Sequence, residues 1–224
     1  MQKFKKNCIL LENLTEKEMS LFEKKIKLKN FRNKETIIRE NNTNEYLYII
    51  EDGVVKVDTF KNNKKQTLSF LKEGDFFGEI AIFTKASASA NVVSVTSSNI
   101  YMINKNDLDI LMIRIPKLAL NMINYLAIRV KNADLVIYDY AFKMLEARVA
   151  SKLLGLVHMF KGKDKDKTFI NLPITHQDLA DYVGTSRETV TKILSKLKEI
   201  KAIDIETKKI IILDEKKLEL WMGE

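Results

Sequence analysis

Residues 174–203 read ITHQDLADYVGTSRETVTKILSKLKEIKAI and predict two short amphipathic helices joined by a tight turn. Thr175 and Asp178 form a capping-box-like start for the first helix, and Ser186 is a natural N-cap for the second. Gly184 lies where a sharp helix-to-helix turn tolerates little side chain. We therefore expect a helix-turn-helix in which Gly184 makes the turn.

The second of these helices has two chemically different faces. Apolar residues recur at helical spacing on one face, namely Val190, Ile193, Leu194, Leu197 and Ile200. Polar residues occupy the other, namely Arg187, Glu188, Thr191, Lys192 and Ser195. A charged face on an arbitrary amphipathic helix is usually only solvated. Two caps and a glycine turn coincide with this pattern, and together they favour a face that reads DNA.

The polar face suits the DNA major groove. Guanine offers two acceptors there and cytosine a donor, so Arg187 can bind guanine and Glu188 can accept from cytosine. Lys192, one turn later, can bind a second guanine or a phosphate. Further candidate DNA contacts are the hydroxyl-bearing residues of the segment, namely Thr175, Ser186, Thr189, Thr191 and Ser195.

The composition is that of a globular protein of two modest domains. The 224 residues are 46% hydrophobic and 30% charged. No stretch approaches the roughly 20 apolar residues of a membrane span, and no secretory signal is evident, so we expect a cytoplasmic protein without membrane attachment. The net charge of +8 fits a nucleic-acid partner.

Few residues are available for metal or nucleophilic chemistry. Cys8 is the only cysteine, which excludes a disulfide within one chain and a four-cysteine iron–sulfur cluster. Of the two histidines, we expect His176 on a helix surface and His158 as a packed or partly exposed neighbour of the core. No paired carboxylates or nucleophile elbow stand out, so we predict no metal site and no enzyme.

The N-terminal half has the pattern of a small antiparallel barrel or jelly roll. A helix is predicted from Thr15 to about Lys27, followed from about Asn30 to Asn104 by short β-rich runs. Asp52-Gly53 is a strong hairpin signal within this region.

A long helix is predicted after Pro116. Its apolar residues alternate three and four positions apart, as Ile123, Leu126, Val130, Ala133, Ile137, Tyr140 and Met144. That heptad seam predicts a parallel two-stranded coiled coil and hence a homodimer, with packing against its own domain as the alternative.

The remaining segments are predicted from local pattern. Residues 145–160 read as another helix with Val149, Leu153 and Val157 buried, and residues 161–167 as a charged loop. Residues 203–213 read as a hairpin, whose tip at residues 207–209 could approach DNA phosphates as a wing.

The run GTSRETVTKILSKL resembles the helix-turn-helix of the cyclic-AMP receptor protein / FNR (Crp/Fnr) family of bacterial transcription regulators. The resemblance assigns base reading to Arg187, Glu188 and Lys192. It implies double-stranded DNA as partner and a half-site similar to TGTGA. Lys192 stands where the cyclic-AMP receptor protein has arginine and lacks its planar fork, so weaker discrimination is expected at that base.

Residues 74–83, GDFFGEIAIF, resemble the phosphate-binding cassette of cyclic-nucleotide-binding domains. The resemblance places Gly78, Glu79 and Ile80 at the effector pocket, with Glu79 either contacting a ligand or capping the cassette turn. The family's phosphate-binding Arg-Ser pair becomes Ala88-Ser89, and its adenine contacts become Ala133-Asp134. These losses should cost several kcal/mol, so micromolar cyclic AMP binding is not expected. The pocket is expected to be small and apolar, lined by Ile82, Phe83, Ala86, Ala88 and Ala90.

The resemblance spans nearly the whole chain and implies an α+β protein. Its parts would be a cyclic-nucleotide-binding-like β-roll sensor domain (residues 1–112), a dimerisation helix and hinge (113–144) and a winged helix-turn-helix (145–224). RNA polymerase is an expected partner, with residues 161–167 either contacting it or merely solvated. No cofactor is predicted. The sequence leaves two possibilities for the effector: an apolar or redox ligand, including haem held by non-histidine ligands, or no effector at all. A second alternative is a protein whose helix-turn-helix has lost DNA binding.

Overall fold

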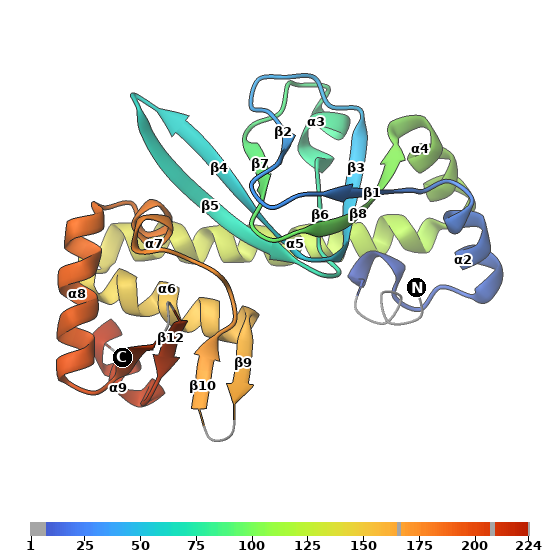
Figure 1. Cartoon of the computed structure of the whole chain (residues 1–224). Helices are drawn as coiled ribbons and strands as arrows, with labels where there is room; N and C mark the ends of the chain where they lie inside the picture. The colour runs from blue at the N-terminus through green and yellow to red at the C-terminus, as the bar shows by residue number, and fades with distance from the viewer. Residues whose placement is uncertain (1–7, 165–166, 207–208, 224) are drawn as a thin grey trace. The chain divides into compact units, whose positions relative to one another are not determined.

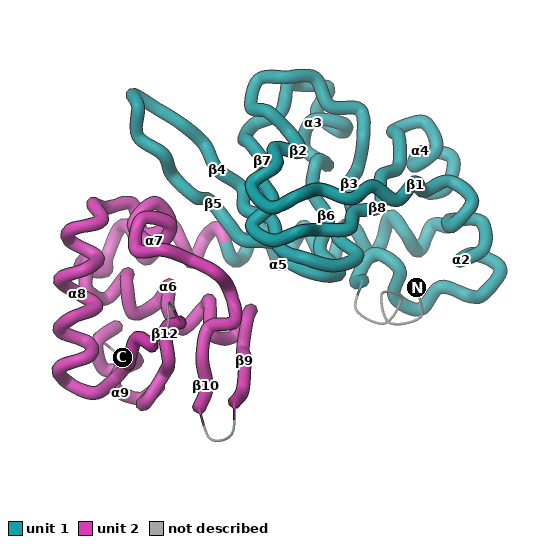
Figure 2. Tube along the Cα trace, viewed as in Figure 1, with its two compact units in different colours: residues 1–132 teal, residues 133–224 magenta. Residues whose placement is uncertain are grey.

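The computed structural model describes residues 8–164, 167–206 and 209–223. The chain forms two compact units, residues 1–132 and residues 133–224 (Figure 2). The long helix α5 (Pro116–Phe142) begins in the first unit and ends in the second. Each unit is described by itself.

Unit 1 is built on two four-stranded antiparallel sheets (Figure 1). The first has the order β1 (Lys27–Phe31), β8 (Ser98–Asn104), β3 (Tyr46–Asp52) and β6 (Phe76–Phe77). The second has the order β2 (Thr36–Ile38), β7 (Asn91–Ser94), β4 (Val54–Lys61) and β5 (Lys64–Lys72). This arrangement is the predicted β-roll.

Strand β3 explains how the two sides of the first sheet are filled. Side chains alternate between the faces of a strand. Leu47 and Ile49 join a core cluster that includes helix residues, whereas Tyr48 and Ile50 join a cluster drawn from the strands of both sheets. Four consecutive residues of β3 are therefore buried, on two faces.

Helices cover one face of the first sheet. They are the 3₁₀ helix η1 (Ile9–Leu11), α2 (Glu16–Glu23), α4 (Lys105–Arg114) and the first half of α5, whose Phe22, Leu108 and Leu118 are fully buried. The short helix α3 (Glu79–Thr84) follows β6.

The predicted helix over residues 15–27 is shorter than expected. A complete capping box at Thr15 starts α2, but the helix ends at Glu23. Lys27 already pairs with Met102 as the first residue of β1, which also begins earlier than predicted. Backbone pairing with a strand distant in sequence outweighed the local helical pattern.

The predicted hairpin at Asp52-Gly53 is wrong. The strands on either side, β3 and β4, lie in different sheets. Gly53 carries the chain between them with φ +101°, and a Cβ there would come within 2.3 Å of the Ser98 hydroxyl. The hairpin in this region joins β4 to β5 through Asn62 and Asn63, both at positive φ, and is the long extension in Figure 1.

Unit 2 combines a helical core with one four-stranded sheet. Its further elements are α6 (Leu145–Met159), β9 (Lys161–Asp164), β10 (Lys167–Ile170), α7 (His176–Val183), α8 (Arg187–Glu199), β11 (Ile203–Glu206), β12 (Lys209–Ile212) and α9 (Glu215–Met222). The sheet order is β11-β12-β10-β9. Val149, Leu153 and Val157 of α6 are fully buried, as predicted.

The described residues of the predicted loop at 161–167 are paired strand residues. They supply β9 and the first residue of β10, with Lys167 opposite Asp164, while residues 165 and 166 lie outside the described residues. Strand β10 also pairs with β12, so sheet hydrogen bonds override the charged pattern. The predicted hairpin of β11 and β12 is confirmed, although Thr207 and Lys208 at its tip lie outside the described residues. His158 is exposed on α6.

The long helix ends before the predicted seam does. Helix α5 stops at Phe142, and Met144 is the N-cap residue of α6. Among the described residues no single helix is long and apolar enough to cross a membrane; α4 and α5, bent by 110°, meet the length and composition requirement only as a pair.

The thiol of Cys8 is predicted to be unreactive in the folded protein. Cys8 is 2% exposed, and burial raises the pKa of its thiol to about 12. A raised pKa keeps the thiol protonated at pH 8, whereas the thiolate is the nucleophile. A disulfide reagent such as DTNB should therefore label one thiol per chain only after denaturation, and rapid labelling of the native protein would contradict this burial.

Candidate DNA-binding face and effector pocket

The helix-turn-helix is built from local capping bonds. Thr175 Oγ1 accepts from the Asp178 N–H at 3.1 Å, and Asp178 Oδ2 accepts from the Thr175 N–H at 3.0 Å. Gly184 ends α7 with φ 80°, and Ser186 Oγ accepts from the Thr189 N–H at 3.1 Å. The predicted capping box, glycine turn and second cap are all confirmed.

The apolar face of α8 is buried, with one exception. Val190, Ile193, Leu194 and Leu197 are at most 3% exposed. Ile200 is 38% exposed because it is the C-cap residue beyond the last helical turn. The orientation of α8 is thus fixed by four side chains, which leaves the opposite face at the surface.

The predicted base-reading side chains are exposed together on α8. Arg187, Glu188 and Lys192 all lie at the surface, and within the described residues neither Arg187 nor Lys192 has an ion-pair partner. Hydrogen bonds from its own backbone N–H and from the Ser186 hydroxyl lower the pKa of Glu188, which keeps its carboxylate ionised as an acceptor. The face therefore presents two cationic donors and one anionic acceptor.

Two other basic residues of this segment already have acidic neighbours. Lys196 Nζ lies 3.7 Å from Glu146 Oε1, and Lys198 Nζ lies 2.8 Å from Asp204 Oδ1. Both pairs are exposed, so they contribute little to stability and leave the lysines available to phosphates.

The candidate hydroxyls are engaged within the motif. Those of Thr175 and Ser186 cap helices, and that of Thr189 lies 3.0 Å from Ser186 Oγ. Thr191 Oγ1 donates to the Arg187 carbonyl at 2.8 Å, and Ser195 Oγ donates to the Thr191 carbonyl at 3.0 Å. The hydroxyl protons of Thr175, Thr191 and Ser195 are thus donated within the motif.

One residue near this face was missed by the sequence reasoning. His176 Nδ1 lies 2.9 Å from Thr191 Oγ1, so the first residue of α7 contacts the polar face of α8. Helical spacing could not predict this contact, because it joins two helices.

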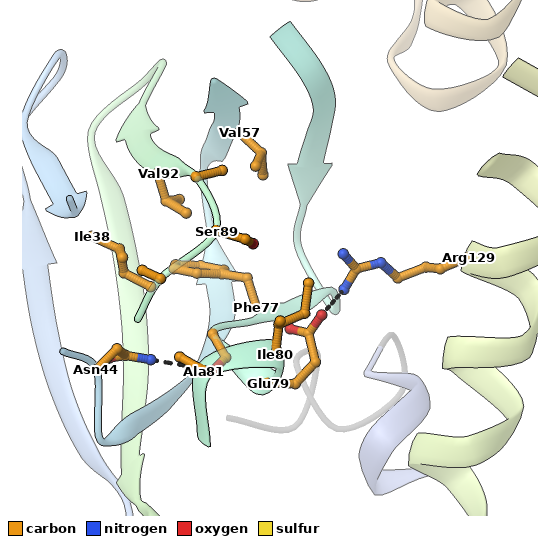
Figure 3. Close-up of a pocket in the computed structure, with 13 residues that line it drawn as sticks. Ile38, Asn44, Val57, Phe77, Glu79, Ile80, Ala81, Ser89, Val92 and Arg129 are labelled. Atoms are coloured by element: carbon orange, nitrogen blue, oxygen red, sulfur yellow. Dashed lines mark hydrogen bonds and ion pairs between the residues drawn. The ribbon is translucent and has the colours of Figure 1, made fainter. Parts of the chain in front are cut away.

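Unit 1 contains a small cavity beside the phosphate-cassette-like segment (Figure 3). Its volume is about 50 Å³. The predicted residues Gly78, Glu79, Ile80, Ala88 and Ser89 line it, together with Ala90, Asn44 and apolar side chains such as Phe77 and Val92. No group of His, Cys, Asp and Glu side chains that could hold a metal ion occurs among the described residues.

Three side chains expected at the pocket lie elsewhere. Ile82 is buried in the cluster beneath the helices, Phe83 is 43% exposed, and Ala86 lines a separate, more polar groove. Successive residues of α3 point about 100° apart, so only its first residues reach the cavity.

Ala133 and Asp134 are exposed residues of α5 and do not line the cavity of unit 1. Their place beside a ligand would require a partner chain and stays a prediction.

Glu79 has a partner that the sequence reasoning did not foresee. Arg129 Nη1 of α5 lies 2.8 Å from Glu79 Oε1, and both side chains line the cavity (Figure 3). Glu79 is 4% exposed, so the ion pair compensates a buried carboxylate. Neither of the two predicted roles of Glu79, ligand contact or capping of the turn, anticipated this arrangement.

Two further polar contacts lie on the same face of α5. The Tyr125 hydroxyl donates to Asp75 Oδ1 at 2.9 Å, and burial raises the pKa values of both groups. Asn121 Nδ2 donates to the carbonyls of Leu10 and Glu12 at 3.0 and 2.9 Å. Asn121, Tyr125 and Arg129 are four residues apart and therefore share one side of the helix.

Most of the predicted seam is uncovered in the single chain. Ile123, Val130 and Ile137 are each more than 60% exposed, whereas Leu126 packs partly against the core of unit 1. Within unit 2, the Tyr140 hydroxyl donates to the Val183 carbonyl at 3.1 Å.

Comparison with known proteins identifies a domain family in each of the two units. Residues 28–114 match the cyclic nucleotide-binding domain family, and residues 147–221 match the Crp-like helix-turn-helix domain. The cyclic AMP receptor protein of Thermus thermophilus is 31% identical over 164 residues, which is 73% of each chain. The global nitrogen regulator of Synechococcus elongatus is 26% identical over 192 residues, 84% of this chain and 86% of that protein.

A solved structure shows the same fold. A mutant of CooA from Carboxydothermus hydrogenoformans superposes with a TM-score of 0.79 at 20% identity, covering 96% of this chain and 95% of the other. The helix-turn-helix, the β-roll and the sequence identity to the relatives all indicate the same family. The chain belongs to the Crp/Fnr family of DNA-binding transcription regulators.

Proposed function

We propose that this protein is a homodimeric regulator that reads a palindrome of TGTGA-like half-sites. The observation that carries the proposal is the exposed set of Arg187, Glu188 and Lys192 on the capped and packed helix α8. Two donors and one acceptor on one helix face match the donor and acceptor pattern of consecutive G·C pairs in the major groove.

Each side chain has a distinct role in this proposal. Arg187 binds the O6 and N7 acceptors of a guanine through two parallel hydrogen bonds, and Glu188 accepts from the N4 amino group of a cytosine. Lys192 binds a guanine or a phosphate as a point charge, so the base that it faces is read less strictly.

A palindrome requires two copies of α8 about 34 Å apart, one for each successive major groove. The exposed seam of α5 supports a dimer, because an isolated apolar stripe in water is unfavourable and a parallel coiled coil would bury it. RNA polymerase is the proposed protein partner, since the relatives include a global transcriptional regulator.

We also propose that cyclic AMP does not control this protein. A cavity of about 50 Å³ is far smaller than the roughly 300–1,000 Å³ of a typical ligand pocket. Ala88 leaves no cation beside Ser89, and the Arg129 guanidinium is already paired with Glu79. A small apolar effector, or DNA binding without any effector, fits these features better; haem would be detected by its absorption spectrum.

Specific DNA binding is tested by a gel shift with a TGTGA palindrome at several salt concentrations. We expect the wild-type protein to prefer the palindrome to a scrambled duplex. Arg187→Ala should weaken specific binding by about 1–3 kcal/mol and relax the preference at one base pair. Lys216→Ala, which removes an equal charge from an exposed position of α9, is the matched control. Unchanged specificity of Arg187→Ala would show that another residue reads the base.

The dimer is tested by substitution within the seam. Val130→Glu would place two carboxylates in the dimer interface, where burial of unpaired charge is costly, and should weaken dimerisation by about 100-fold or more. Asn124→Glu adds the same charge at an exposed position away from the seam and should not. Analytical ultracentrifugation measures both, and a dimer that tolerates Val130→Glu would rule out this seam.

The absence of cyclic AMP control is tested by titration calorimetry. We expect no heat of binding up to about 100 μM nucleotide, because the missing charged and neutral hydrogen bonds together cost several kcal/mol. The Thermus thermophilus cyclic AMP receptor protein provides a positive control. Micromolar binding by this chain would mean that another cation replaces the arginine missing at Ala88.

A further inference from the structure

The contact between His176 and Thr191 ties α7 to the exposed face of α8. Thr191 Oγ1 lies 2.9 Å from His176 Nδ1 and 2.8 Å from the carbonyl oxygen of Arg187. Thr191 is exposed, on the same helix face as Arg187 and one position from Lys192. The environment of its side chain is therefore set by two neighbours within the motif.

The protons of this contact can be assigned by counting. A threonine hydroxyl has one proton, and a carbonyl oxygen can only accept. The bond to the Arg187 carbonyl takes that proton, so His176 must donate through Nδ1. Neutral His176 is therefore the tautomer protonated at Nδ1, and the imidazolium form makes the same bond.

This arrangement decides what Thr191 can offer to DNA. Its hydroxyl proton is used by the helix, and one lone pair is used by His176. The hydroxyl therefore has no proton left to donate to a base, and of its two lone pairs one remains. The methyl group is the part of the side chain that can make an apolar contact. In the major groove, a threonine methyl group contacts the 5-methyl group of thymine.

We infer that Thr191 reads a thymine methyl group and that His176 is the positioning residue that holds it in place. The inference rests on the proposed DNA-binding function and adds a specificity contact beside Arg187, Glu188 and Lys192. A TGTGA half-site and its complement contain thymines at which such a contact could be made.

The DNA side is tested by replacing each thymine of the half-site, one at a time, with deoxyuridine, which removes only the methyl group. Wild-type protein should lose about fourfold in affinity at one position, the factor expected for one buried methyl-sized group, and little at the others. Equal affinity for every substituted duplex, with specific binding intact, would overturn the inference and leave the proposed function standing. Absence of sequence-specific binding to the unsubstituted duplex would overturn both this inference and the proposed function.

The protein side uses matched variants. Thr191→Ser keeps the hydroxyl and both hydrogen bonds but lacks the methyl, so its affinity should no longer depend on the thymine methyl. His176→Ala should reduce the same dependence, whereas His176→Asn should restore it, because its amide nitrogen can take the place of Nδ1. His158→Ala, at the exposed histidine of α6, should behave as wild type. A His176→Ala variant with undiminished thymine dependence would exclude the positioning role.

A measurement without DNA tests the inference about Thr191 separately from the proposed DNA-binding function. Nitrogen-15 NMR of the histidine rings at pH 8 should show His176 protonated at Nδ1. Protonation at Nε2 would overturn the inference about Thr191 without bearing on DNA binding.

Discussion

Three polar side chains on one face of α5 fix this helix against unit 1. Asn121, Tyr125 and Arg129 follow each other at four-residue intervals and bind, respectively, two carbonyls near the N-terminus, Asp75 and Glu79. Each partner is a polar group whose burial without a hydrogen bond would be costly. A rotation of α5 would break all three contacts together. They therefore determine which apolar residues of the helix remain uncovered, and the proposed dimer seam follows from this constraint.

The same contacts shape the cavity. Glu79 starts α3 and is nearly fully buried, so it needs a cation, and α5 supplies Arg129. The ion pair lines a cavity whose other walls are largely apolar. An anionic ligand that recruited Arg129 would leave Glu79 as an unpaired buried carboxylate, which is strongly unfavourable. A neutral ligand carries no such penalty, which is why the ion pair bears on the chemistry of the effector as well as on the orientation of α5.

Features encoded within a few residues were predicted from the sequence, and features that depend on distant partners were not. The caps at Thr175 and Ser186 and the turn at Gly184 are local, and the structure confirms them. Glycine is typical of hairpin turns, but Gly53 instead connects β3 and β4, which lie in different sheets. Residues 161–164 belong to a segment with a loop-like charge pattern, yet pairing with β10 makes them strand β9. Arg129 and Glu79 are 50 residues apart, and no periodicity links them.

Helix capping, and hydrogen bonds from side-chain hydroxyls to backbone carbonyls of α8, reduce the number of donor groups that the surface of α8 can offer to a ligand. Ser186 is needed to start the helix, and the hydroxyl protons of Thr191 and Ser195 are given to helix carbonyls. In the proposed recognition of DNA, the charged groups that face the bases are the guanidinium of Arg187, the carboxylate of Glu188 and the ammonium of Lys192. Because an ammonium has no planar fork, Lys192 would then discriminate between bases less well than arginine would. In the same proposal, an apolar contact from the Thr191 methyl group, positioned by His176, would contribute more to specificity because the contact made by Lys192 is weak.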